Sequence, residues 1–282
     1  MSVLDRAGML KVATWNVNGV RARWREVLEW LERERPDVVC LQEVKASPEQ
    51  VPEELREHPD YFCYWHGHKG YSGVALLLAR STFGARPQFE HPPFDHETRI
   101  VTAVAGGILF ASIYVPNGGK DFAAKVRFLE ALDAFCSQAR ADGLKVLLCG
   151  DLNVARELRD VHKKLQKPDE IGQTADERAR LEQIIAHGLV DLARKFHPDE
   201  DELFTWWAPW RNNRERNIGW RIDYVLPSTT LAERALSCDA YREQGTSDHA
   251  LVLSTFDLEL PKPTAIEPPA PPADSGGQLR LL

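Results

Sequence analysis

The chain has 282 residues, of which 43% are hydrophobic and 27% charged, and its formal net charge is −7. This composition is typical of a soluble protein with a large core, and the acidic balance argues against a protein that coats nucleic acid non-specifically, although it leaves room for a local basic face. No apolar run approaches the ~20 residues that a membrane-spanning helix needs. The five cysteines include no C-x-x-C pair, which favours reduced thiols in a cytoplasmic protein, and the lack of a long apolar run leads us to expect no membrane contact.

Short apolar runs rich in Val, Ile and Leu predict the strands. Several of these runs are apolar at successive positions, which is typical of strands buried on both faces. In chain order the predicted strands cover residues 10–17, 37–42, 73–79, 100–105, 108–115, 145–150, 221–226 and 250–256.

Amphipathic patterns between these runs predict helices over residues 22–35, 122–142 and 174–187. Thr174 and Glu177 have the spacing of a capping box, while Gly106-Gly107 between two strands predicts a hairpin. Hairpins and helical crossovers in one chain indicate mixed sheets covered by helices, which is an α/β sandwich. We expect a short N-terminal extension over 1–9, a catalytic domain over 10–258 and a Pro-rich disordered tail over 259–282.

Polar residues follow or interrupt six of the apolar segments. In α/β sheets, side chains at strand ends and in the adjoining loops are where ligands bind. The set is rich in carboxylate and amide oxygens and contains one histidine, so it suits Mg²⁺ or Mn²⁺ and a phosphate-containing substrate. Its members are Asn16, Glu43, Tyr114, Asn117, Asp151, Asn153, Asp223, Asp248 and His249.

Each of these residues also has an ordinary structural explanation when it is taken alone. Asp151 follows a strand in a Gly-Asp turn, Asp223 alternates with apolar neighbours as a solvent-facing strand residue does, and His249 begins a strand. The consecutive residues Ser247, Asp248 and His249 do not form a serine-hydrolase triad among themselves, because consecutive side chains on an extended segment point to opposite faces. The chain has no G-x-S-x-G motif, although a triad of distant residues stays open.

Nine short motifs in order resemble the exonuclease III-type AP endonucleases of the DNase I-like endonuclease/exonuclease/phosphatase superfamily. The resemblance covers residues 10–257 and implies a four-layer α/β sandwich of two mixed β-sheets flanked by helices. The motifs are "WNVNG" (15–19), "LQEVK" (41–45), "GYSGVAL" (70–76), "YVPNG" (114–118), "GDLNVA" (150–155), "GLVDL" (188–192), "FTWW" (204–207), "GWRIDY" (219–224) and "SDHA" (247–250).

The resemblance implies a role for each matching residue of the catalytic centre. Glu43 corresponds to the main Mg²⁺ ligand, with Asp248 in or around the metal shell, and Asn18 stands where some relatives carry an aspartate. Asp151 corresponds to the group that activates the attacking water, and Asn153 to the residue that positions it. The remaining residues are the phosphate contacts Tyr114 and His249, the His249-orienting carboxylate Asp223, and the site-lining Asn16 and Asn117.

The same resemblance implies a DNA substrate. Trp206 and Trp220 match apolar walls around a flipped-out abasic sugar, and Tyr71, Arg99 and Lys120 match loop positions that meet double-stranded DNA. The implied reaction is Mg²⁺-dependent hydrolysis of the backbone 5′ to abasic sites, which leaves a 3′-hydroxyl, with 3′→5′ exonuclease or 3′-end trimming activity. A phosphatase or phospholipase of the same fold is one alternative, and a non-catalytic DNA-damage-binding protein is another.

The tail carries a motif of its own. Gln278, Leu279, Leu281 and Leu282 resemble the Q-L-x-L-[FL] peptide by which bacterial repair and replication proteins bind the sliding clamp. A Pro-rich tether that ends in a short apolar peptide suits recruitment. We expect the folded domain to act as a monomer.

Overall fold

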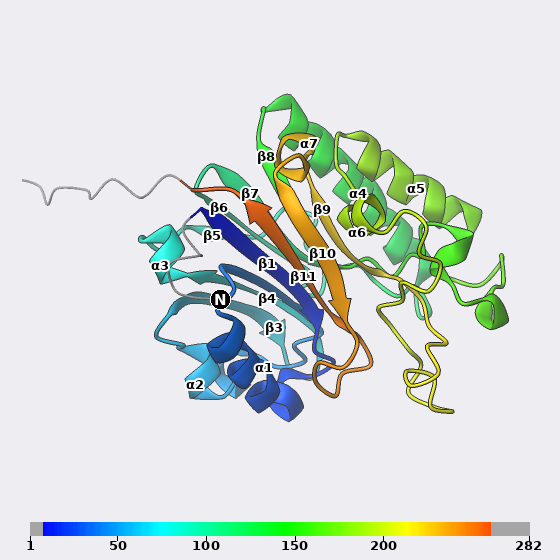
Figure 1. Ribbon diagram of the computed structural model, residues 1–282, viewed down its shortest axis with the longest axis horizontal. Helices are drawn as coiled ribbons and strands as arrows, with labels where there is room; N and C mark the ends of the chain where they lie inside the picture. The colour runs from blue at the N-terminus through cyan, green and yellow to red at the C-terminus, as the bar shows by residue number, and fades with distance from the viewer. Residues whose placement is uncertain (1–7, 261–282) are drawn as a thin grey trace, which may run out of the picture.

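The computed structural model describes residues 8–260, and the proposed clamp peptide lies outside this range. Within the described residues the strands form two sheets (Figure 1). The six-stranded sheet has the order β10-β11-β1-β2-β4-β3, and the five-stranded sheet has the order β5-β6-β7-β8-β9. The strands are β1 (Met9–Asn16), β2 (Val38–Gln42), β3 (Tyr61–His68), β4 (Tyr71–Ala79), β5 (Phe89–Glu90), β6 (Ile100–Ala105), β7 (Ile108–Tyr114), β8 (Lys145–Asp151), β9 (Asp223–Pro227), β10 (Ala235–Tyr241) and β11 (Leu251–Asp257).

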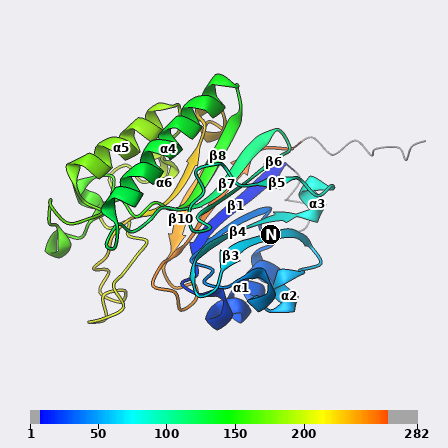
Figure 2. The same ribbon diagram turned by 180° about the vertical axis from the view of Figure 1, so that it is seen from behind.

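Helices cover the outer face of each sheet, so that the fold has four layers. The helices α1 and α2 lie on the outside of the six-stranded sheet, and α4 and α5 lie on the outside of the five-stranded sheet (Figures 1 and 2). The described helices are α1 (Val20–Glu34), α2 (Glu53–Arg56), α3 (Arg80–Phe83), α4 (Phe122–Ala141), α5 (Ala175–Ala186), α6 (Leu192–Phe196) and α7 (Thr229–Ala232). The predicted four-layer sandwich is therefore confirmed.

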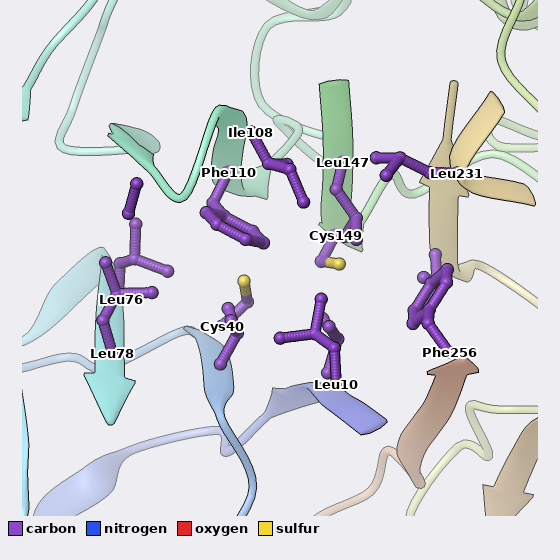
Figure 3. Packing of buried hydrophobic residues seen from close by; sticks show 14 of the residues in the cluster. Leu10, Cys40, Leu76, Leu78, Ile108, Phe110, Leu147, Cys149, Leu231 and Phe256 are labelled. Atoms are coloured by element: carbon purple, nitrogen blue, oxygen red, sulfur yellow. The ribbon is translucent and has the colours of Figure 1, made fainter. Parts of the chain in front are cut away.

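The main core lies between the two sheets. Leu10, Cys40 and Leu76 from the six-stranded sheet face Phe110 and Cys149 from the five-stranded sheet (Figure 3). Each fully buried side chain of this size contributes roughly 1.5–3 kcal/mol to folding. Leu258 and Leu260, which follow β11, also pack against this core.

Local signals in the sequence set several element boundaries. Thr174 caps α5 in a capping box with Glu177, as predicted. Gly106 and Gly107 both have positive φ, at 57° and 77°, and join β6 to β7, as the favoured two-residue hairpin turn requires. Both sheets mix parallel and antiparallel pairs, because β1–β2 and β7–β8 are parallel while their other neighbours are antiparallel.

Candidate active site

Three polar side chains lie in one row across the five-stranded sheet. Tyr114 at the end of β7 pairs with Asp151 at the end of β8, and Asp151 pairs with Asp223 at the start of β9. Paired residues of neighbouring strands point to the same face of a sheet. Asp223 is only 2% exposed, so it is not the solvent-facing strand residue that its apolar neighbours favour.

The strand that carries Asp151 comes unusually close to its neighbour. A Cβ atom added at Gly150 would lie 1.9 Å from the carbonyl oxygen of Ile113. Only glycine therefore allows this approach. The approach helps to fix where Asp151 stands beside Tyr114.

The other sheet supplies Asn16 and Glu43. Asn16 ends β1 and is paired with the last residue of β2, after which Glu43 follows directly. The buried amide Nδ2 of Asn16 donates to Glu43 Oε1 at 3.0 Å and to Asp151 Oδ2 at 2.9 Å. Asn16 thus links the two carboxylates and the two sheets.

His249 lies between two carboxylates. Its Nδ1 is 2.9 Å from Asp223 Oδ2, and its Nε2 is 3.8 Å from Asp151 Oδ2. Burial lowers the pKa of His249, but the charges of Asp223 and Asp151 outweigh burial and raise the pKa to about 10. The ring is therefore an imidazolium at neutral pH, and the pair with Asp223 fixes its orientation. Ser247 donates its hydroxyl proton to the carbonyl oxygen of Asn16 at 2.6 Å, as a structural turn residue does.

The carboxylates of the site differ in acidity. Burial raises the pKa of Asp151, His249 lowers it, and Asp223 and Glu43 raise it again, to about 7. Burial also raises the pKa of Glu43, but Lys45, His249 and Asn16 outweigh it, so that the pKa of Glu43 is lowered. Glu43 is thus a permanent anion, and Asp151 exchanges a proton near neutral pH.

Oxygen atoms at one side of this cluster already surround a cationic group. Lys45 Nζ lies 2.5 Å from Glu43 Oε2 and 2.6 Å from Asn18 Oδ1. Asn18 Nδ2 in turn donates to Asp248 Oδ1 at 2.8 Å. Ligand atoms of Glu43, Asp151 and His249 also lie within 4.8 Å of one another. Carboxylate and amide oxygens around a positive charge fit a hard divalent cation.

Two tryptophans border the cluster. Trp206 and Trp220 meet edge to face, with 5.7 Å between ring centroids. Trp206 Nε1 donates to Asp248 Oδ2 at 3.1 Å, and the Trp206 ring centroid is 6.4 Å from that of His249. Both tryptophans are half-buried, so neither belongs to the closed hydrophobic core.

Asn153 is held beside Asp151 by its own backbone. Its φ of 51° is left-handed, its N–H donates to Asp151 Oδ1 at 2.9 Å, and its Nδ2 donates to the Val115 carbonyl at 3.0 Å. The exposed Asn117 donates from Nδ2 to Asn153 Oδ1 at 3.4 Å. Asn153, in the loop after β8, therefore contacts Asp151 directly, and Asn117, in the loop after β7, contacts Asn153.

The sequence analysis did not identify Lys125, which supports the two loops that carry Asn117 and Asn153. The buried Lys125 of α4 donates to the carbonyl oxygens of Asn153 at 2.7 Å and Asn117 at 3.3 Å. Its Nζ is also 2.5 Å from Glu177 Oε1, with both side chains fully buried. The sequence does indicate that Lys125 is buried, because it lies on the same helix face as the apolar Phe128, Leu129 and Leu132.

Tyr71, Arg99 and Lys120 form a second group. Tyr71 is 47% exposed, and Lys120 Nζ lies 5.0 Å from the centroid of its ring. Arg99 is only 2% exposed and donates from Nη2 to the Tyr71 hydroxyl at 3.0 Å. Tyr71 therefore presents an open surface, whereas Arg99 lies beneath it and does not have the open loop position that we expected.

A model of the endonuclease/exonuclease/phosphatase family matches residues 13–249. The chain belongs to this family. It is 32% identical to an exodeoxyribonuclease of Bacillus subtilis over 251 residues, which are 86% of this chain and 98% of the relative. It is 31% identical to Recombination repair protein 1 of Drosophila melanogaster over 261 residues, but these span 90% of this chain and only 38% of that longer protein.

Solved structures of the family share the fold. An AP endonuclease from Archaeoglobus fulgidus has a TM-score of 0.78 at 31% identity, with 88% of this chain and 100% of that chain covered. A 3′ phosphatase from Neisseria, bound to a product DNA hairpin, has a TM-score of 0.80 at 28% identity, with 88% and 99% covered. The predicted resemblance is confirmed, and the protein is a nuclease of the exonuclease III and AP endonuclease type.

An exposed tryptophan, Trp210, lies in a loop of this protein and was not predicted as a site residue. Trp210 is 60% exposed in the segment 208–217, beside the positive-φ residues Arg211 and Asn212. Arg214, in contrast, is half-buried and donates to the backbone carbonyls of Arg242 and Ser247, so it holds the segment in place. In the sequence, the sign of this exposed residue is a tryptophan between a proline and an arginine in a polar stretch.

Among the helices of residues 8–260, none has both the length and the apolar character needed to cross a membrane.

Proposed function

We propose that the protein is a Mg²⁺-dependent DNA repair nuclease that hydrolyses the backbone 5′ to abasic sites and leaves a 3′-hydroxyl. The observation that carries this proposal is the bridge from Asn16 to both Glu43 and Asp151, next to the imidazolium of His249. This bridge brings together three features in one site. They are an oxygen cluster around Glu43 that suits a cation, the carboxylate of Asp151 with its near-neutral pKa, and the positively charged donor His249. The similarity to AP endonucleases and exodeoxyribonucleases supports the substrate.

Glu43, Asp248 and Asn18 are the residues that would hold the metal ion. Their oxygens suit Mg²⁺, and Mn²⁺ would use the same donors. When bound, the ion would supply charge neutralisation for the phosphoryl oxygens. Lys45, which lies between Glu43 and Asn18, would have to move when the ion binds.

Asp151 is the proposed base for the attacking water. With a pKa of about 7, its carboxylate takes up a proton at the pH at which the enzyme works. The N–H of Asn153 fixes one oxygen of Asp151, and the Asn16 amide fixes the other. These bonds orient the carboxylate before the substrate arrives.

His249 and Tyr114 are the proposed phosphate contacts. The Nδ1 of His249 is engaged by Asp223, which leaves the Nε2–H to donate to a phosphoryl oxygen. A fixed positive donor stabilises the charge that develops on the phosphate during attack. Burial, with the charges of Glu43 and Asp151, raises the pKa of Tyr114, so its hydroxyl stays a neutral donor.

Substrate recognition falls to the aromatic and basic residues around the cluster. Trp206 and Trp220 would wall an apolar pocket for a sugar without a base, since removing such a nucleotide from the stack costs least. Tyr71, Lys120 and Asn117 would meet the backbone of double-stranded DNA, with Arg99 supporting Tyr71 from below. The exposed Trp210 would stack on bases or sugars.

A duplex with a single abasic analogue tests this proposal. In Mg²⁺ it should be cut 5′ to the lesion, whereas an intact duplex and the same duplex in chelator should not. The variant Asp151→Asn should cleave about 10²- to 10⁴-fold more slowly and should bind the lesion duplex as the parent does. An unchanged cleavage rate in Asp151→Asn would refute the role of this carboxylate.

A 3′ phosphatase or 3′-trimming activity is a second candidate, which the similarity to the Neisseria 3′ phosphatase favours. The same bond is broken in both reactions, a phosphate ester P–O bond, so the same residues serve. A nicked duplex with a 3′-phosphate, tested beside the abasic duplex, would show which substrate is turned over faster. A phospholipase would leave both DNA substrates intact.

A further inference from the structure

A second cluster of metal-binding side chains lies outside the proposed catalytic residues. It consists of His66 near the end of β3 and of His91 and Asp95 in the segment 91–99 between β5 and β6. One ligand atom from each of the three residues lies within 4.8 Å of the other two. The cluster thus joins an edge strand of the six-stranded sheet to a segment of the five-stranded sheet.

Asp95 is held firmly at this place. Its Oδ1 accepts hydrogen bonds from the backbone N–H groups of Arg99 at 2.8 Å and Ile100 at 3.1 Å. Its other oxygen, Oδ2, is 2.6 Å from His66 Nε2. One carboxylate oxygen is therefore fixed by the backbone, and the other faces the two histidines.

The two histidines lie unusually close together. Their rings are stacked, with 3.7 Å between centroids and 25° between planes. Two imidazolium ions would repel each other at this distance, which favours a neutral imidazole, the form that binds metal ions.

His91 lies at the surface and has a polar contact at each ring nitrogen. It is exposed, its Nδ1 is 3.4 Å from the carbonyl oxygen of Ile100, and its Nε2 is 2.7 Å from the hydroxyl of Tyr64. A proton on Nδ1, directed at the carbonyl, leaves Nε2 with its lone pair, as in metal-bound histidines whose other nitrogen is hydrogen-bonded. A modest turn about the side-chain torsions of His91 would unstack the rings and point both histidines at one ion.

We propose that His66, His91 and Asp95 bind one Zn²⁺ ion, in a site separate from the catalytic metal. Two imidazoles and one carboxylate, with water in the fourth position, form a common Zn²⁺ environment. The ion would take the place of the proton between His66 and Asp95, and Tyr64 would give up its hydrogen bond to His91. The site would act as a staple between the two sheets, because its ligands come from β3 and from the segment between β5 and β6.

The staple would act on the exposed surface around Tyr71 through the segment 91–99. Asp95 binds the backbone of Arg99, and Arg99 supports the exposed ring of Tyr71. A bound ion would therefore hold the segment that carries Arg99 against β3. The proposal does not depend on the nature of the substrate, because it concerns how a surface is fixed.

Zinc binding to the full chain tests this proposal. The protein is stripped with chelator, dialysed against Zn²⁺ and assayed for bound metal, in the Glu43→Gln background that weakens the catalytic metal site. His91→Ala removes an exposed ligand, and His96→Ala removes an exposed histidine of the same segment that lies 3.6 Å from Glu97. Both variants share the same catalytic residues, so only the second cluster differs between them.

We expect one more Zn²⁺ equivalent in the Glu43→Gln protein and in its His96→Ala form than in its His91→Ala form. The affinity should fall by at least about 100-fold in His91→Ala, because altering even an outer-shell partner costs up to that factor. Co²⁺ in place of Zn²⁺ should give a visible absorption band that His91→Ala lacks. Equal zinc content in all three proteins, or no zinc in any of them, would overturn the proposal.

Discussion

At the scale of single residues, the site depends on Asp151 and His249, whose pKa values are both raised above their usual values. The pKa of Asp151 is about 7, against a usual value of 3.8. We therefore expect the single-turnover cleavage rate to rise as the pH increases through about 7, because only the deprotonated carboxylate accepts the proton of water. A rate that is flat across this range would exclude Asp151 as the base.

The same shift affects stability, with the opposite sign from that of a salt-bridged carboxylate. The folded-state pKa lies above the unfolded value, so the folded state binds the proton more tightly and Asp151 lowers stability as the pH rises from about 4 to about 7. Asp151→Asn removes this buried charge. The variant that is slow in catalysis should therefore be the more stable one at pH 8 in metal-free buffer, as measured by urea unfolding.

His249 provides the complementary test. Its folded-state pKa of about 10 exceeds the usual 6.5, so its contribution to stability is fully present below about 6.5 and is lost as the pH rises through about 10. Asp223→Asn removes the strongest attraction on the imidazolium. In metal-free protein the pKa of His249, followed by NMR of the ring, should fall clearly below the parent value, and the cleavage rate should fall with it. An unchanged pKa would show that Asp223 does not hold the proton on His249.

At the scale of elements, α4 supports the two loops that carry Asn117 and Asn153. Lys125→Met removes one partner of the buried pair with Glu177, which should cost about 3–5 kcal/mol and slow cleavage, because the carbonyls of Asn117 and Asn153 lose their donor. The double variant Lys125→Met/Glu177→Gln removes the unpaired charge but keeps an acceptor for Gly172 and Thr174, so it should recover part of the stability but not the activity. Chemical unfolding and single-turnover cleavage separate these effects. Full recovery of activity in the double variant would mean that Lys125 has only a structural role.

The strands illustrate what could be predicted from the sequence. The eight apolar runs all correspond to strands, but β3, β5 and β10 were missed, and each of them is at the edge of its sheet. An edge strand has a neighbouring strand on one side only and is therefore more open to solvent, so its sequence is less continuously apolar. The burial of Asp223 is a related case, because the strand pattern that favoured a solvent-facing position takes no account of Thr205 and His249, which contact Asp223 from distant segments.

The candidate site, too, could be predicted from the sequence only in part. Polar residues at strand ends indicated a shared oxygen-rich site, since strand ends are local features of the sequence. The separate roles of these residues came from the family resemblance. The helix face of Lys125 indicates that it is buried, but its partners, and the positions of Lys45 and Arg99, depend on which side chains from distant segments meet them, and no local pattern encodes that.

At the scale of the whole molecule, the tail would extend the reach of the enzyme. Deleting residues 278–282 should abolish binding to a bacterial sliding clamp and leave cleavage of a short abasic duplex unchanged, because the proposed catalytic residues all lie between Asn16 and His249. Pull-down or surface plasmon resonance with the full chain and the truncated chain measures this. A truncated chain that binds the clamp as well as the full chain, or a full chain that does not bind it, would exclude the motif.

The bridge made by Asn16 has a consequence for how damage to the fold would appear. One amide group spans the gap between the two sheets and holds a carboxylate of each. A small sliding of one sheet over the other, too slight to unfold the protein, would stretch these two bonds before it disturbed the hydrophobic layer behind them. The cleavage rate would then report the alignment of the two sheets. Mildly destabilising substitutions in the core would slow cleavage while the protein still unfolded in one cooperative transition by calorimetry.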